Sequence, residues 1–313
     1  MKTIIGGEAM KRHFYFIINQ NSRDYKKSVE QLGYLLPKYT PHYDLFITES
    51  LDQSYNLLSQ LKRSLWPTDV IVAVGGDGSL HYLINHVKQL DINNPISFIP
   101  SGSGNDFARS NGIPLDLSKA IRHLFHGRQV VDLDLLQVRT ADDIFLAVNS
   151  IGYGLDGDII HELTQKSENK RKFGGSSYFR SILSAFTHLK PFTVQIQTDS
   201  ELESHTYQDV QLLLIANQPY FGGGIKIFPT ANAKDQKLDI LIASQVKLHH
   251  LIKILWLILS GRPFLGHPKF KCLSAQSVDI TVMNPQYAQR DGESFLKYGE
   301  PLSIGLVTHP FYL

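Results

Sequence analysis

Residues 68–79 read Thr-Asp-Val-Ile-Val-Ala-Val-Gly-Gly-Asp-Gly-Ser, an apolar run that passes directly into a glycine-rich loop. A short β-branched run bounded by turn signals is typical of a buried strand in a parallel sheet, so we expect a strand over residues 68–74. After the loop, apolar residues recur at helical spacing from Leu80 to Leu90. The glycines therefore lie where a strand passes into a helix. The N–H groups and dipole of that helix N-terminus suit an anion such as phosphate.

The same strand, loop and helix pattern recurs at residues 96–112. Ile96 to Pro100 reads as a strand, and Ser101 to Gly104 reads as a loop that opens a short helix. Two such loops at the carboxyl ends of neighbouring strands face one crevice, which is where open α/β sheets bind ligands. The alternative is that both loops are only tight turns, but a turn rarely needs three glycines and an aspartate within residues 75–78.

Length and composition indicate an ordinary globular protein of two domains. The chain has 313 residues, 42% of them hydrophobic, which is enough for a substantial core. Its formal net charge of +2 is too small to indicate nucleic-acid binding, and no nucleic-acid motif is present. We therefore expect no nucleic-acid partner, while a homodimer stays open.

Cysteine usage and the first residues favour the cytoplasm. The single cysteine, Cys272, excludes an intramolecular disulfide, as expected in a reducing compartment. The opening segment is too polar and too short in apolar residues for a signal peptide, and Met10 is an alternative start. The most apolar run, residues 248–260, carries His249, His250 and Lys253 and is shorter than the ~20 residues that span a bilayer. We expect it to form a buried or interfacial helix.

The pattern of strand and helix signals in the sequence changes near residue 130. Before that point, strand and helix signals alternate, which predicts a doubly wound parallel sheet. Beyond it, strand-like segments become dense, which predicts a β-rich, largely antiparallel and sandwich-like domain. We expect an α/β domain over residues 11–132, completed by a C-terminal strand at about 305–313, and a β-rich domain over 133–304.

The glycine loops also resemble those of a known family. Residues 75–79 and the run Pro-Ser-Gly-Ser-Gly-Asn-Asp-Phe-Ala-Arg at 100–109 resemble the diacylglycerol kinase catalytic domain of bacterial lipid kinases, in a superfamily that includes sphingosine kinases. The resemblance continues in the family's order through Phe-Gly-Gly-Gly at 221–224, Pro-Thr-Ala at 229–231, Asp-Gln-Lys-Leu-Asp at 235–239 and Asp-Gly-Glu at 291–293. It implies two domains with ATP in the cleft between them and a lipid substrate on the β-rich domain.

The resemblance implies a role for individual positions around the nucleotide. The turn at 75–81 would hold the phosphates, residues 19–23 would form a first phosphate loop, and Thr48 and Ser103 would add further contacts. The residues assigned to ATP are Asn19, Gln20, Asn21, Ser22, Arg23, Thr48, Gly75, Gly76, Asp77, Gly78, Ser79, Leu80, His81, Ser103 and Asn105.

The metal and the catalytic base are also implied by resemblance. Asp235 matches a magnesium ligand, with the backbone carbonyls of Asn232 and Lys237 completing the site. Glu293 matches the proton acceptor. Asp77 is the other catalytic candidate, expected near Mg-ATP, and the matching aspartate of sphingosine kinases is an alternative base.

The sequence departs from the family pattern at three points. The first loop, Asn-Gln-Asn-Ser-Arg at 19–23, lacks the usual proline and glycine. His81-Tyr82 stands where Asn-Glu is usual, which removes an acidic residue. Gln236 replaces a glycine after Asp235, so we expect that loop to differ slightly while it keeps the oxygen ligand that a hard cation needs.

The expected function is therefore that of an ATP- and Mg²⁺-dependent lipid kinase acting on the hydroxyl of diacylglycerol or a related lipid, in phospholipid metabolism. An NAD kinase shares the Gly-Gly-Asp-Gly turn and a two-domain plan, but residues 102–107 and 291–293 argue against it. A catalytically silent lipid or nucleotide binder is the third alternative, although such a protein has no need of a base. The pattern G-x-G-x-x-G at 152–157 lacks the acidic residue that a dinucleotide site requires.

A lipid substrate predicts peripheral association with the inner face of the membrane. Lys166, Lys170, Arg171 and Lys172 form the conspicuous basic cluster of the chain. Such a cluster is either a solvated loop or a contact for anionic lipids.

Overall fold

The computed structural model describes residues 12–22, 24–126, 129–165, 182, 184–262, 264–296 and 298–313. Two sequence predictions, the nucleotide contact at Arg23 and the basic cluster at 166–172, lie outside the described residues. The chain divides into two compact units. The first contains the described residues up to Gly102, then Asn111–Asp132 and His309–Leu313; the second contains Ser103–Ser110 and Leu133–Thr308.

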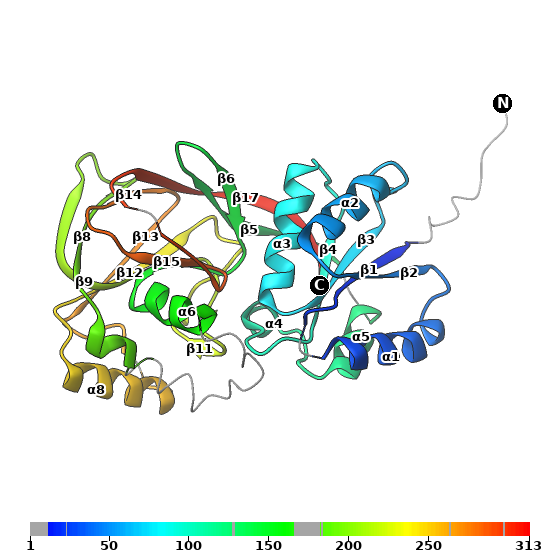
Figure 1. Ribbon diagram of the computed structural model, residues 1–313, viewed down its shortest axis with the longest axis horizontal. Helices are drawn as coiled ribbons and strands as arrows, with labels where there is room; N and C mark the ends of the chain where they lie inside the picture. The colour runs from blue at the N-terminus through cyan, green and yellow to red at the C-terminus, as the bar shows by residue number, and fades with distance from the viewer. Residues whose placement is uncertain are drawn as a thin grey trace. The chain divides into compact units, whose positions relative to one another are not determined.

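The first unit is built on a parallel sheet. Its strands run in the order β4-β3-β1-β2, and the end of β17 lies beside β4, with Phe311 paired to Ile96. The strands are β1 (Phe14–Asn19), β2 (Tyr43–Thr48), β3 (Val70–Gly75), β4 (Ile96–Pro100) and β17 (Pro301–Tyr312). The helices are α1 (Tyr25–Leu35), the 3₁₀ turn η1 (Leu36–Lys38), α2 (Leu51–Leu61), α3 (Asp77–Gln89) and α5 (Leu117–Leu124). In Figure 1, α1 and α5 lie on one side of the sheet, and α2 and α3 lie on the other.

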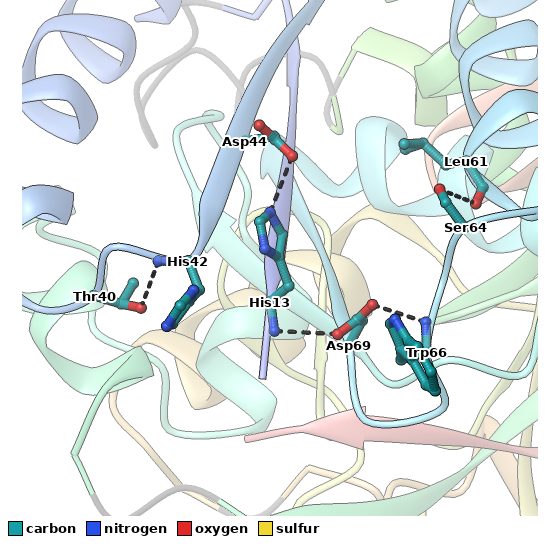
Figure 2. A network of polar contacts seen from close by, with 8 residues as sticks. All are labelled: His13, Thr40, His42, Asp44, Leu61, Ser64, Trp66 and Asp69. Atoms are coloured by element: carbon teal, nitrogen blue, oxygen red, sulfur yellow. Dashed lines mark hydrogen bonds and ion pairs between the residues drawn. The ribbon is translucent and has the colours of Figure 1, made fainter. Parts of the chain in front are cut away.

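The start of β3 is set by a polar network rather than by the apolar run alone. The buried carboxylate of Asp69 accepts N–H bonds from His13 (3.2 Å) and Trp66 (2.8 Å), and Nε2 of His13 lies 3.0 Å from Oδ2 of Asp44 (Figure 2). Asp69 therefore links the amino ends of the neighbouring strands β1 and β3. For this reason the strand begins at Val70, two residues later than the sequence predicts.

The second unit is β-rich and antiparallel. Its strand pairings are all antiparallel where they are described. The strands are β5 (Val130–Arg139) from Leu133 onward, β6 (Ile144–Ala147), β7 (Ser150–Gly154), β8 (Phe192–Thr198), β9 (His205–Ala216), β12 (Leu238–Ser244), β13 (Phe270–Ala275), β14 (Val278–Val282), β15 (Tyr287–Arg290), β16 (Glu293–Leu296) and the start of β17, with the small hairpin β10 (Tyr220–Phe221) and β11 (Ile225–Lys226). The helices are α4 (Asp106–Ser110), α6 (Leu155–Gln165) and α8 (Leu248–Leu259). The predicted fold class, a parallel α/β part followed by an antiparallel β-rich part, is confirmed.

Alternate residues of the central strands face two different cores. On β12, Ile240 and Ile242 belong to one hydrophobic cluster, whereas Leu241 belongs to the other. Successive side chains of a strand point to opposite faces, so both faces of this sheet are covered and the strand reads as a continuous apolar run. Leu251 and Ile254 place α8 over the second cluster.

The segment Ser103–Ser110 lies inside the range predicted for the first domain but groups with the second unit. Its Asp106 accepts bonds from the backbone of residues 223 and 224, which explains the grouping. Within the described ranges, no helix combines the length and the apolar character needed to cross a bilayer.

Candidate functional site

The first loop and the end of β2 meet through backbone and amide bonds in the first unit. Nδ2 of Asn19 donates to Oγ of Ser79 (3.2 Å), and Oδ1 of Asn19 accepts the N–H of Asn21 (2.9 Å). The N–H of Gln20 donates to the carbonyl of Thr48 (2.9 Å). The Asn19–Asn21 bond is an Asx-type turn, so an asparagine side chain shapes the loop that the family usually forms with proline and glycine.

Position 75 favours glycine because side-chain atoms of neighbouring residues approach its Cα closely. A Cβ on this residue would lie 2.3 Å from Oγ of Ser79 and 3.9 Å from Cβ of Ser22. The missing side chain lets the first loop and α3 approach the end of β3. Gly76 then caps α3 with extended backbone, and its carbonyl accepts the N–H groups of Ser79 (3.0 Å) and Leu80 (3.3 Å).

The N-terminus of α3 presents backbone donors beside buried hydroxyls. The first N–H groups of any α-helix lack intrahelical acceptors, which gives this end an affinity for anions. Asp77 and Gly78 occupy these first positions. The hydroxyls of Ser22 and Ser101 are buried without a hydrogen-bond partner among the described residues, and the N–H of Ser101 bonds the carbonyl of Gly75 (2.7 Å). Buried donors without acceptors are a feature that a phosphate would satisfy.

A cavity of about 140 Å³ opens in the first unit at the ends of these strands. Several predicted nucleotide contacts share it. Its polar lining residues are Asn19, Asn21, Thr48, Ser50, Ser54, Ser79 and Tyr82. Leu80 and His81 are buried and do not belong to this lining.

In the second unit, a buried carboxylate binds the glycine triplet at 222–224. Asp106 accepts the N–H of Gly223 at 2.9 Å and that of Gly224 at 2.7 Å. The three glycines have φ values of 62°, 84° and 111°, which lets successive N–H groups point at one anion. The sequence alone predicts no role for Asp106. Three consecutive glycines can bind an anion through their backbone N–H groups, and here that anion is part of the chain itself.

Burial raises the pKa of Asp106 above its usual value, while the two glycine N–H groups and Arg109 oppose that rise. The negative charge of Asp291 adds to it. The Asp-Gly-Glu motif therefore lies close to α4 and the glycine triplet. Ser103 and Asn105 precede α4, and Asn105 is buried with φ +55°.

Asp291 and Gly292 form the two-residue turn between β15 and β16, with φ values of 45° and 90°. Positive φ at both positions is the geometry of the favoured hairpin turn, for which Asp-Gly is a preferred sequence. The carboxylate of Asp291 accepts the N–H groups of Val148 (2.6 Å), Asn149 (2.7 Å) and Ser150 (3.1 Å). The turn is thus anchored, and the half-buried Glu293 begins the strand that follows it.

The loop that carries the predicted magnesium ligands is exposed, and the carboxylate of Asp239 lies near it. Oδ1 of Asp235 accepts the N–H of Lys237 (3.1 Å), and the carbonyl of Asn232 accepts the N–H of Lys234 (2.7 Å) and of Asp235 (3.3 Å). Burial, and then the charge of Asp235, raises the pKa of Asp239 to about 6. Two carboxylates that repel one another fit a hard cation. In the described parts of the chain, no group of three His, Cys, Asp or Glu side chains forms a metal cluster.

The second unit also contains an apolar cavity of about 90 Å³ that the sequence does not predict. Aliphatic and aromatic side chains from β9, β12, α6 and α8 form it, including Leu241, Leu251 and Ile254. Asp156 and Gln211 are the polar residues of its lining. Residues far apart in sequence make this cavity, so no local pattern indicates it.

Asp156 stands out in that lining because burial raises its pKa to about 7, against a smaller opposing effect of the hydrogen bond from Gln289. Its Oδ2 is buried without a hydrogen-bond partner among the described residues. The G-x-G-x-x-G pattern at 152–157 surrounds it as the end of β7 and the start of α6. A Cβ on Gly157 would lie 2.0 Å from the carbonyl oxygen of Tyr287, so close packing accounts for that glycine.

Comparison with known proteins assigns both halves of the chain. The family described as the diacylglycerol kinase catalytic domain matches residues 13–138, and the YegS C-terminal NAD kinase β-sandwich-like domain matches residues 149–304. The chain belongs to the diacylglycerol kinase-like family. The family predicted from the sequence is thereby confirmed. The second match explains why a diacylglycerol kinase-like chain shares a two-domain architecture with NAD kinase.

Relatives of this diacylglycerol kinase-like chain span most of its length. YtlR of Bacillus subtilis is 28% identical over 262 residues, which cover 79% of this chain and 81% of the relative. A diacylglycerol kinase of Bacillus subtilis is 26% identical over 226 residues, covering 72% and 71%. The crystal structure of a diacylglycerol kinase from Bacillus anthracis has a TM-score of 0.69 and 19% identity, covering 95% and 94%, and it supports the fold.

We predict that Gly75→Ala disrupts the first-unit loop. The added Cβ would force Ser79 or the backbone to move, which costs about 1–3 kcal/mol in a packed site and misplaces the Asn19–Ser79 contact. Thermal unfolding and titration with a fluorescent ATP analogue measure the two effects. Gly33→Ala is the matched control, since a Cβ there meets nothing within 4 Å and a helical alanine is more stable by up to about 1 kcal/mol. Normal nucleotide binding by Gly75→Ala would contradict the assigned role of the loop.

We predict that Asp156→Asn flattens the pH dependence of stability. The folded-state pKa of about 7 lies above the ordinary 3.8, so this group favours the folded state in acid and the benefit is lost as pH rises through 7. The variant should unfold at a higher temperature than the wild type near about pH 8, and the difference should shrink near about pH 5. Asp142→Asn, at an exposed position, is the control. An unchanged pH slope in Asp156→Asn would refute this account of the carboxyl group.

Proposed function

We propose that this protein transfers the γ-phosphoryl group of ATP to the hydroxyl of a lipid, diacylglycerol or a related molecule, with Mg²⁺ as the metal. The observation that carries the proposal is the apolar cavity of the second unit, in a chain whose first unit has a phosphate-type loop. NAD kinases share the loop, but NAD is polar, and a lining of aliphatic and aromatic side chains suits an acyl chain instead. The name of the Bacillus subtilis diacylglycerol kinase supports the same choice.

Positioning and charge neutralisation supply most of the catalysis in phosphoryl transfer. The N–H groups at the start of α3, the hydroxyl of Ser79 and the amide of Asn19 are the donors that the first unit offers to phosphate oxygens. Asp77 in the first turn of α3 would hold Mg²⁺ near them, and Asp235 would hold a structural Mg²⁺ with the carbonyls of Asn232 and Lys237. The metal neutralises charge on the phosphate oxygens when it is bound.

Glu293 is proposed as the general base. The lipid hydroxyl oxygen forms a bond to the γ-phosphorus while the bond to the ADP oxygen breaks, and the hydroxyl proton passes to the carboxylate of Glu293. A base within hydrogen-bond reach typically accelerates such a step by roughly 10²- to 10⁴-fold. The anchored turn at Asp291 and Gly292 supports this role because it fixes where the carboxylate lies.

Incubation with radiolabelled ATP and a panel of lipids and NAD tests the function directly. We expect label in a phospholipid product, with loss of the reaction when Mg²⁺ is chelated. Labelled NADP without labelled phospholipid would support the NAD kinase alternative. No labelled product with any acceptor would support a silent binder.

We predict that Glu293→Gln lowers kcat by roughly 10² to 10⁴-fold and leaves ATP affinity nearly intact, because the amide keeps the size but loses the basicity. Asp77→Asn should weaken Mg-ATP binding as well as turnover. Glu203→Gln, at an exposed position, is the matched control. Near-normal turnover in Glu293→Gln, combined with loss of turnover at intact ATP affinity in Asp77→Asn, would transfer the role of base to Asp77.

A further inference from the structure

Helix α8 has two apolar faces, and only one of them is buried. Leu251, Ile254 and Leu255 are 5–6% exposed and pack into the second unit. Leu248, Ile252 and Trp256 are 47%, 54% and 53% exposed. Their spacing of four residues places them in one stripe along the helix. Single exposed apolar residues are normal, but a stripe rimmed by polar residues indicates an interaction surface.

The residues around this stripe are positively charged. Residues 246–278 contain no Asp or Glu, but they contain three His and five Lys or Arg: Lys247, Lys253, Arg262, Lys269 and Lys271. The guanidinium of Arg262 lies 4.8 Å from the ring centroid of Trp256. Lys247 and Lys253 lie at or on α8, and Arg262 lies against Trp256, so positive charge adjoins the stripe and indicates a partner of the opposite sign.

The histidines near the stripe lie in the same positively charged environment. The rings of His249 and His250 are 4.0 Å apart, and those of His250 and His267 are 5.3 Å apart. Desolvation, followed by repulsion from His249, His267, Lys269 and Lys247, lowers the pKa of His250. A further positive charge is therefore disfavoured at this end of α8.

We propose that the outer stripe of α8, with its flanking basic residues, is a docking surface for an anionic lipid bilayer. An exposed tryptophan beside an arginine, on a helix with a cationic flank, is the composition of an interfacial membrane helix. Figure 1 shows α8 on the outside of the second unit, and the side chains of the stripe are exposed. This inference rests on the proposed function, because an enzyme that phosphorylates a lipid must approach a lipid surface.

The buried face of the same helix strengthens the choice of a membrane over an acidic protein. Leu251, Ile254 and Leu255 line the apolar cavity of the second unit. Only the thickness of α8 separates that cavity from the outer stripe. Docking of the stripe would therefore bring the cavity to the level of the lipid headgroups, where an acyl chain is available.

Vesicle sedimentation of the full chain tests the proposal. We expect at least roughly tenfold more binding to vesicles of phosphatidylcholine with added phosphatidylglycerol than to phosphatidylcholine alone, and weaker binding at high salt. The double variant Ile252→Glu with Trp256→Glu should lose this binding. The matched control is Ile144→Glu with Trp66→Glu, because these residues have the same types and are 57% and 63% exposed elsewhere in the chain. Equal binding by the two double variants would overturn the proposal.

Tryptophan fluorescence locates the contact independently of activity. The chain has two tryptophans, so Trp66→Phe leaves Trp256 as the reporter. We expect a blue shift of its emission on addition of phosphatidylglycerol vesicles and none with phosphatidylcholine. An emission maximum that does not move with either vesicle would overturn the proposal.

Two further measurements separate this proposal from its competitors. Lipid phosphorylation in neutral detergent micelles should survive in the Ile252→Glu, Trp256→Glu variant, since neither side chain belongs to the cavity or the phosphate loop. If no variant phosphorylates any lipid while vesicle binding still depends on the stripe, the proposed function fails and the docking surface stands. A dimer in analytical ultracentrifugation that the same variant abolishes would instead assign the stripe to a second copy of the chain and overturn the membrane proposal.

Discussion

The placement of Glu293 depends on the carboxylate of Asp291. Asp291 is 9% exposed, and its carboxylate accepts three consecutive backbone N–H groups, from Val148 to Ser150. Bonds to a charged acceptor are shorter and stronger than neutral ones, and three of them offset much of the cost of burying the charge. The N–H of Asp291 also donates to the carbonyl of Ser150 (3.1 Å). The β15–β16 hairpin is therefore tied to the β6–β7 connection, and the strand that begins with Glu293 cannot move independently of it.

Buried aspartates position the other loops of the second unit in the same way. Asp106 binds the glycine triplet, and Oδ2 of Asp134 accepts the N–H of Gln236 at 2.8 Å in the proposed metal loop. Each carboxylate links segments about a hundred or more residues apart, which local backbone bonding cannot do. Replacement of any of them would leave buried N–H groups without an acceptor. Aspartates in a family motif are thus divided between scaffold, such as Asp106 and Asp291, and proposed chemistry, such as Asp77 and Asp235.

Sequence patterns predicted those features whose cause is local. The β3–loop–α3 unit follows from β-branched residues, glycines and helical periodicity within residues 68–90, and its strand boundary differed only because the carboxylate of Asp69 is used by His13 and Trp66. The apolar cavity could not be predicted, because it needs the three-dimensional register of β9, β12 and α8. The long-range partner of Asp106 could not be predicted for the same reason. The division of α8 into buried and exposed faces was hidden because both faces are apolar.

Gln236 shows how a departure from the family pattern is accommodated. Its φ of +58° lies in the left-handed region, which costs a non-glycine residue about 1–2 kcal/mol. The bond from its N–H to the buried Asp134 stabilises that conformation. The left-handed residue in turn lets the N–H of Lys237 reach the carboxylate of Asp235. The buried carboxylate of Asp134 therefore holds the loop in a conformation that glycine would adopt at lower cost.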